Sequence, residues 1–275
     1  RAIKELEKEL GVTVFDRNSK GIKLTPDGER LIAAGKKILK EIDDVEEEFR
    51  ERKNNKSVFS VSVPRASYIS SAFAEFSRKL SGEEKCEVYY AETNAQRTML
   101  NIAENGYKLG IIRYAAQYDR AFKEMLSEKG MSYELVAEFN MVLLVNKNSP
   151  LVSPEPVKLK DLESYTEIAH ADLYVPGASP EEIKNEELTP DVKRRIFVFE
   201  RAGQFDILSA NPRAFMWVSP VSEEITSRYG LVQIKCSDNA KIYKDVLIYP
   251  SGYKLTAKDS AFIDALCTAK RRFLK

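Results

Sequence analysis

Histidine, cysteine and long apolar runs are scarce in this sequence of 275 residues. It contains one histidine, His170, and three cysteines, Cys86, Cys236 and Cys267, which lie far apart and form no CxxC or Cys/His cluster. Zinc sites, a disulfide framework and histidine-based catalysis are therefore not expected, and a reducing cytoplasm fits best. No stretch approaches the roughly 18 apolar residues that span a membrane. No secretory segment opens the sequence.

An excess of charge of one sign is also missing. The 43 Lys and Arg balance 42 Asp and Glu, for a net charge of +1, so any contact with nucleic acid must be local. An apolar fraction of 43% excludes collagen and wholesale disorder and indicates a globular chain. GxSxG, P-loop and HExxH motifs are absent, so we expect no enzyme and no cofactor or metal.

The first 25 residues predict a helix followed by a small basic hairpin. Ile3, Leu6 and Leu10 share one helical face, and Gly11 stands where a left-handed C-cap belongs. Residues 12–15 predict a strand, 16–21 a turn and 22–24 a returning strand. This order is typical of the end of a winged helix-turn-helix, although a solvated helix and hairpin without special purpose is an alternative. The basic residues proposed to contact DNA are Arg1, Lys4, Arg17, Lys20 and Lys23.

Residues 25–53 predict one long helix. Thr25 is suited to the N-cap and Pro26 to the first helical position. A narrow apolar stripe follows, made of Leu31, Ile38, Ile42, Val45 and Phe49. A helix of about 42 Å with such a stripe favours pairing with the same helix of a second copy. Packing against its own domain is the alternative, and residues 50–56 predict a hinge.

From residue 57 onward, strands and helices alternate. The predicted strands are 58–63, 87–91, 109–112, 167–169, 196–199, 214–218 and 231–234, with Trp217 in the core of its strand. The clearest helices follow a capping box of Thr93 and Gln96 and a cap at Thr256. This alternation predicts an α/β fold with parallel sheets.

Two stretches carry a family resemblance. Residues 3–17, IKELEKELGVTVFDR, and 24–29, LTPDGE, resemble the LysR-type transcriptional regulators. The resemblance implies a multi-domain α/β protein: the tail of a winged helix-turn-helix (1–25), a long linker and dimerisation helix (26–56) and a two-lobed effector-binding domain like periplasmic binding proteins (57–275). Lobe 1 is expected at about 57–138 and 244–275 and lobe 2 at about 139–243, with crossings near 138–141 and 243–246. Base-reading residues would precede Arg1, so an N-terminally truncated chain is expected.

Ligands of open α/β sheets bind beyond the carboxyl ends of the strands. This rule and the resemblance together select Arg65, Ser67, Thr93, Asn94, Arg113, His170 and Arg201 as candidate effector contacts. If two of the arginines line the cleft, an organic anion is favoured. The alternatives are a capping role for Thr93, surface ion pairs for the arginines and a structural role for His170.

The sequence therefore predicts a ligand-responsive, DNA-binding transcription regulator of the LysR type in the cytoplasm. Its expected partners are double-stranded DNA, a small-molecule effector, RNA polymerase and further copies of itself in a homodimer or homotetramer, and no membrane. One alternative is a solute-binding receptor with the same two-lobe fold and no DNA role, which would be monomeric. Another is an enzyme that uses the cleft between the lobes.

Overall fold

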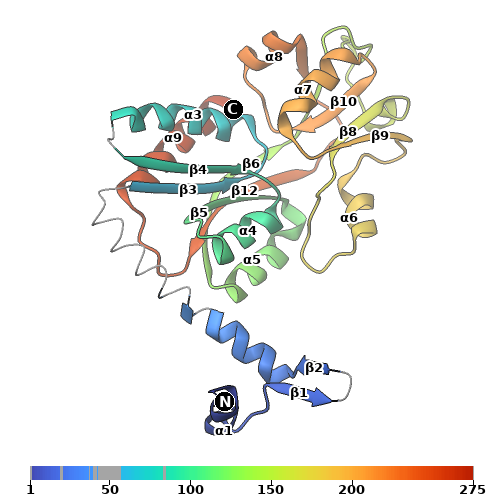
Figure 1. The fold of residues 1–275 in the computed structure, drawn as a ribbon. Helices are drawn as coiled ribbons and strands as arrows, with labels where there is room; N and C mark the ends of the chain where they lie inside the picture. The colour runs from blue at the N-terminus through green and yellow to red at the C-terminus, as the bar shows by residue number, and fades with distance from the viewer. Residues whose placement is uncertain are drawn as a thin grey trace. The chain divides into compact units, whose positions relative to one another are not determined.

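The computed structural model describes residues 2–18, 21–36, 38–39, 42, 57–82 and 85–274. The chain divides into two compact units, Arg1–Val58 and Phe59–Lys275 (Figure 1). Within the described residues, no helix is both long enough and apolar enough to cross a membrane.

The first unit begins with a helix and a hairpin. Helix α1 (Ala2–Leu10) ends at Gly11, whose φ of 67° confirms the predicted left-handed C-cap. Strands β1 (Phe15–Asn18) and β2 (Gly21–Leu24) pair antiparallel, with Asn18 opposite Gly21. The turn predicted over 16–21 is therefore too wide, because residues 16–18 and 21 already belong to the ladder. The predicted strand over 12–15 likewise starts later, at Phe15.

A second helix follows the hairpin, and residues 26–36, 38–39 and 42 are helical. Thr25 caps it as predicted, because its Oγ1 accepts a hydrogen bond of 3.0 Å from the Gly28 backbone N–H. Gly28 is needed for close approach to the preceding segment, since a Cβ there would lie 2.2 Å from the Val14 carbonyl oxygen. In the predicted stripe, Leu31 is half-buried and Ile38 and Ile42 are exposed. Val45, Phe49 and the expected hinge lie outside the described residues.

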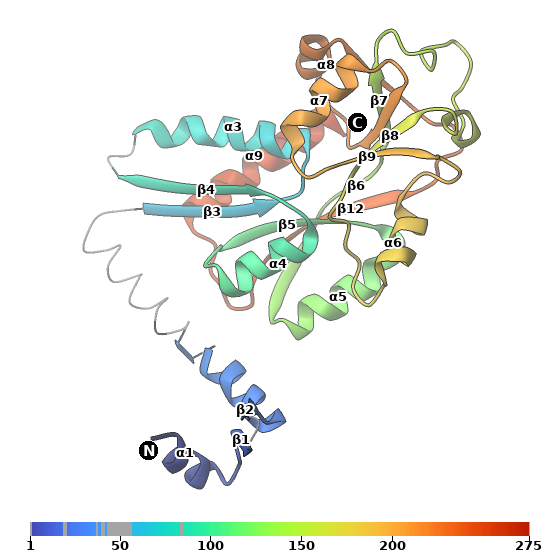
Figure 2. The same ribbon diagram turned by 45° about the vertical axis from the view of Figure 1, so that its right-hand side comes forward.

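The second unit holds two lobes, each built on a five-stranded sheet (Figure 2). Lobe 1 has the strand order β4-β3-β5-β12-β6. Its strands are β3 (Ser57–Val63), β4 (Cys86–Glu92), β5 (Leu109–Ala115), β6 (Met131–Asn140) and β12 (Ile242–Pro250). Its helices are α3 (Ser67–Lys79), α4 (Ala95–Glu104), α5 (Asp119–Glu128) and α9 (Ala257–Phe273), with short 3-10 turns η1 (Leu80–Gly82) and η2 (Ala116–Tyr118). Helices α3 and α9 cover one face of the sheet, and α4 and α5 cover the other (Figures 1 and 2).

Lobe 2 has the strand order β11-β7-β10-β8-β9. Its strands are β7 (Val142–Asn146), β8 (Thr166–His170), β9 (Arg194–Val198), β10 (Ala214–Val218) and β11 (Leu231–Ile234). Its helices are α6 (Pro180–Glu187), α7 (Arg201–Ala210) and α8 (Glu223–Tyr229), with the 3-10 turn η3 (Leu159–Leu162). Both sheets are mixed rather than parallel, because β12 runs antiparallel to β5 and β6, and β7 runs antiparallel to β10 and β11.

The chain crosses between the lobes twice. The first crossing is at Met141, between β6 and β7. The second ends before Ile242, slightly earlier than the predicted 243–246, because Tyr243 already pairs with Ala115 of β5 and Phe139 of β6. The two lobes are therefore connected through β6 and β7 at the first crossing and through β11 and β12 at the second.

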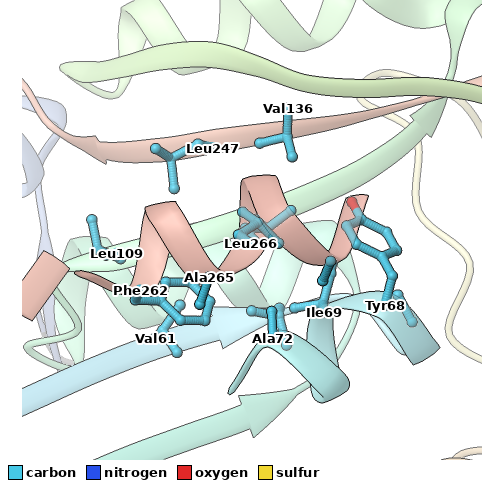
Figure 3. Close-up of a cluster of buried hydrophobic side chains, with 14 of the residues drawn as sticks. Val61, Tyr68, Ile69, Ala72, Leu109, Val136, Leu247, Phe262, Ala265 and Leu266 are labelled. Carbon is cyan, nitrogen blue, oxygen red and sulfur yellow. The ribbon is translucent and has the colours of Figure 1, made fainter. Parts of the chain in front are cut away.

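The core of lobe 1 packs two helices that are far apart in sequence (Figure 3). Figure 3 shows Ile69 and Ala72 of α3 beside Phe262 and Leu266 of α9. Helix α9 is capped by Thr256 as predicted, because its side chain accepts from the Asp259 backbone N–H. One face of α9 is apolar, and its members are buried or packed against this core: Phe262, Ala265, Leu266, Ala269 and Phe273.

Candidate functional site

A cavity of about 180 Å³ lies between the two lobes. Lobe 1 contributes residues at the carboxyl ends of β3, β4 and β5, and lobe 2 contributes residues at the ends of β8 and β10. Met141 and Tyr243, at the two crossings, also line it. Both sheets thus present the strand ends where open α/β folds bind ligands.

Five of the seven predicted contacts line this cavity: Arg65, Thr93, Asn94, Arg113 and His170. Ser67 and Arg201 are not among its lining residues. They contact each other instead, through a hydrogen bond of 2.8 Å from Arg201 Nη2 to Ser67 Oγ. Arg201 also donates to Ser70 and pairs with Glu92 at 3.5 Å, so it joins the start of α7 to lobe 1.

Arg65 is held by an ion pair across the two lobes. Its guanidinium donates two hydrogen bonds of 2.9 Å to the carboxylate of Asp172, which follows β8. The Asn94 side-chain amide donates to the Asp172 carbonyl oxygen at 2.7 Å. Such a two-point arginine–carboxylate pair is stronger and more directional than a single contact.

Arg113 is held in the same way within lobe 1. It donates two hydrogen bonds of 2.7 Å to Asp245, which is fully buried on β12. The Tyr68 hydroxyl donates to the same carboxylate, and burial together with Asp245 raises the pKa of Tyr68. The expected condition for an anion site, two arginines in the cleft, is therefore met, but the carboxylates of Asp172 and Asp245 occupy both guanidinium groups.

Thr93 does not cap the helix that follows it. The N-cap of α4 is Asn94, whose side chain accepts a hydrogen bond of 2.7 Å from the Arg97 backbone N–H. The Thr93 backbone N–H instead donates to the Val63 carbonyl at 2.8 Å. The predicted capping box of Thr93 and Gln96 is therefore wrong by one residue, because α4 begins at Ala95 and the Thr93 N–H is bound to β3.

In the part of the chain that the structure describes, two buried polar side-chain atoms have no hydrogen-bond partner, His170 Nδ1 and Gln204 Oε1, and both residues line the cavity. Gln204 lies in the first turns of α7 and is 4% exposed. Burial, and then the nearby Arg65, lower the pKa of His170 to about 4. The imidazole is therefore neutral near pH 7, so one of its nitrogens can accept a hydrogen bond.

A buried polar network supports the lobe 2 wall. Glu167 accepts from Arg195 at 2.9 Å and from the Thr189 hydroxyl at 2.7 Å. Trp217 donates from its indole N–H to the same hydroxyl at 2.9 Å. Trp217 packs against the lobe 2 core, as predicted, and it also lines the cavity, which was not predicted.

Asp172 and Gln204 also line the cavity and were not predicted from the sequence. Asp172 follows the carboxyl end of β8 by two residues, so the rule that selected His170 could have found it. Gln204 lies three residues after the predicted contact Arg201 on α7, and residues three apart share a helix face. This spacing was a weaker sign that Gln204 would lie near the site. Among the described residues, no group of three or more His, Cys, Asp and Glu side chains could hold a metal ion.

Comparison with known proteins gives a consistent result. The family model described as "Bacterial regulatory helix-turn-helix protein, lysR family" matches residues 1–29. The transcriptional regulator CysB of Burkholderia cenocepacia is 25% identical over 179 residues, which are 63% of this chain and 53% of CysB. The chain spans at most about half the length of the curated relatives it matches.

Two solved structures have a similar fold. A full-length OxyR variant from Pseudomonas aeruginosa matches with a TM-score of 0.52 and 13% identity, over 96% of this chain and 88% of OxyR. The effector binding domain of QuiR in complex with shikimate matches with a TM-score of 0.52 and 16% identity, over 80% of this chain and 100% of that domain. At these identities the likeness concerns the fold.

Proposed function

We propose that this chain, which belongs to the LysR-type transcriptional regulators, binds DNA through its first unit and a small-molecule effector between the lobes of its second. Effector binding changes its action on transcription. We propose a winged helix-turn-helix part over 1–25, a dimerisation helix over 26–56 and an effector-binding domain over 57–275. A cytoplasmic location goes with this role, and none of the three cysteines is joined in a disulfide.

The observation that carries the proposal is the cavity between the lobes. A molecule bound there contacts strand ends of both sheets, which are joined by the crossings at Met141 and before Ile242. It therefore binds closed and open lobes with different affinity, and that difference limits the size of the response. The similar domain of QuiR holds shikimate, which supports a small-molecule effector here.

Lobe closure in this proposal depends on two sets of side-chain contacts between the lobes. Arg65 and Asn94 of lobe 1 hold the Asp172 loop of lobe 2. Arg201 of lobe 2 holds the first turn of α3 through Ser67 and Ser70. Ser67 and Arg201 therefore act on closure, while Arg65, Thr93, Asn94, Arg113 and His170 form the cavity wall.

DNA contact is assigned to the helix α1 and the hairpin. Lys4 on α1 and Lys23 on β2 are exposed and can reach phosphates. The side chains of Arg1, Arg17 and Lys20 lie outside the described set, and their DNA contacts remain proposals. Further proposed partners are a second copy, through the helix that begins at Pro26, and RNA polymerase.

The experiment measures DNA affinity and effector response in the full-length protein. Fluorescence anisotropy with labelled DNA is expected to show weaker binding and a smaller salt dependence for Lys23→Gln, and no change for the exposed Lys254→Gln. Trp217 is the single tryptophan and lines the cavity, so its fluorescence reports effector binding. A monomer that binds small molecules but no DNA would instead be a solute receptor.

A further inference from the structure

The charged side chains that line the cavity already have partners of opposite charge. Arg65 is paired with Asp172, and Arg113 with Asp245. The acidic side chains are paired as well, because Glu167 binds Arg195 and Glu187 binds Lys241. A charged ligand therefore meets side chains whose charge is already neutralised by a partner in this chain.

In the pair of Arg65 with Asp172, both members line the cavity. The Asp172 carboxylate occupies the guanidinium in the two-point geometry that a ligand carboxylate would use. Ser67, another predicted contact, accepts a hydrogen bond from Arg201. Two of the predicted polar contacts, Arg65 and Ser67, are thus bound by this chain's own residues.

The two buried atoms without partners point to a different ligand. Gln204 Oε1 is a hydrogen-bond acceptor, and neutral His170 can accept through one ring nitrogen. Buried acceptors without partners are unfavourable, so a ligand that donates N–H or O–H groups to them is favoured. The apolar part of the wall includes Met141, Leu173, Val175 and Met216.

We infer, on the basis of the proposed effector role, that this cavity selects an uncharged ligand with hydrogen-bond donors, such as a carboxamide, and that Gln204 and His170 bind it. Asp172 is the specificity-determining residue, because it keeps Arg65 from binding carboxylates. Replacing Asp172 releases the guanidinium and reverses the preference.

The experiment compares matched probes that differ in charge at one group. The probes are acetamide with acetate, benzamide with benzoate and nicotinamide with nicotinate, titrated into the full chain while Trp217 fluorescence is recorded. We expect the amide of each pair to bind the unmodified protein at least tenfold more tightly than its carboxylate. Asp172→Asn is expected to bind the carboxylates more tightly than the amides, whereas Asp206→Asn, an exposed change on α7, keeps the original order.

The second variant separates ligand binding from structure. Gln204→Met removes the unpartnered acceptor at similar length, so amide affinity is expected to fall at least tenfold while the melting temperature stays equal or rises. Gln233→Met is the matched control, because Gln233 exchanges two hydrogen bonds with the Val221 backbone and is not among the cavity-lining residues. It is expected to lower the melting temperature and leave amide affinity unchanged.

If the probes bind, three results would each overturn the inference. They are tighter carboxylate binding by the unmodified protein, an unchanged preference in Asp172→Asn, and full amide affinity in Gln204→Met. If Trp217 fluorescence shows that carboxylates bind, the inferred ligand preference is wrong but the proposed effector cavity is still supported. No response to any probe would also overturn the inference, and the DNA and effector measurements above would then decide the proposed function separately.

Discussion

Arg113 and Asp245 form a two-point ion pair of 2.7 Å at the edge of the cavity, with the carboxylate fully buried. The pair links β5 to β12, the strand that returns from lobe 2. The Arg113 guanidinium also lies 4.8 Å from the centre of the Phe139 ring on β6. Three strands of lobe 1 are therefore connected through one arginine.

The first prediction concerns this pair. Asp245→Asn leaves the Arg113 charge buried without a counter-charge, so we expect the free energy of unfolding to fall by about 3 kcal/mol. Urea denaturation measures it. The control is Glu224→Gln, because the Arg228–Glu224 pair on α8 is exposed and such pairs contribute less than about 1 kcal/mol. Equal losses in the two variants would contradict the assigned role.

The second prediction concerns Gly110 on β5. A Cβ there would lie 2.6 Å from Thr98 Cγ2 and 2.7 Å from Ile102 Cδ1 of α4. Gly110→Ala therefore overpacks the strand–helix contact, and we expect a loss of about 1–3 kcal/mol in unfolding free energy. Gly203→Ala on α7 is the control, because a Cβ there meets nothing within 4 Å, and stability should be equal or higher. A neutral Gly110→Ala would show that α4 can move.

The third prediction concerns pH. The pKa of His170 is about 4 in the folded chain and about 6.5 when unfolded, so below pH 6.5 the unfolded chain takes up a proton that the folded chain does not. The free energy of unfolding is therefore highest above pH 6.5 and falls as the pH is lowered towards 4. The expected loss from His170 is about 2 kcal/mol at pH 5. Arg65, Asp172 and Arg113 also act on the charge of the ring, and Arg65 is paired with Asp172 and Arg113 with Asp245.

The measurement is urea denaturation at pH 7 and pH 5. His170 is the single histidine, so His170→Gln should lose less stability over this interval than the unmodified chain. Carboxylates titrate equally in both proteins and cancel from the comparison. The same loss in both proteins would mean that His170 titrates normally.

The fourth prediction concerns self-association. Ile38 is 59% exposed and Ile42 is 50% exposed on the helix that begins at Pro26. If this stripe pairs two copies, Ile38→Lys with Ile42→Lys should shift the protein towards monomer in size-exclusion chromatography with light scattering. Ala33→Lys, an exposed change on another face of the helix, should keep the oligomer. A mass unchanged by the double substitution would remove this helix from the interface.

Local signals in the sequence predicted the helix ends well. Gly11, Thr25 and Thr256 act within a few residues of their own positions, so their roles follow from short-range hydrogen bonds and backbone geometry. The strands β6, β7 and β12 were not predicted. Strand β6 alternates irregularly between buried and exposed side chains, and its partner β12 lies about a hundred residues away. Pairing at that distance leaves no local pattern.

The candidate site shows the same division. The rule that ligands meet strand ends placed Arg65, Asn94, Arg113 and His170 in the cavity from the sequence alone. It could not show that Asp172 and Asp245 would occupy the two arginines, because each carboxylate comes from a segment more than a hundred residues away. Nor could it show that Gln204 would be left without a partner.

By itself, the sequence determined the helix ends at Gly11, Thr25 and Thr256, and which residue types stand at the carboxyl ends of the strands that it predicted. Only the tertiary structure decided which charges neutralise one another and which polar atoms stay available for a ligand. The reason is that a hydrogen bond or ion pair depends on distances of about 3 Å, and the approach of the two lobes sets those distances.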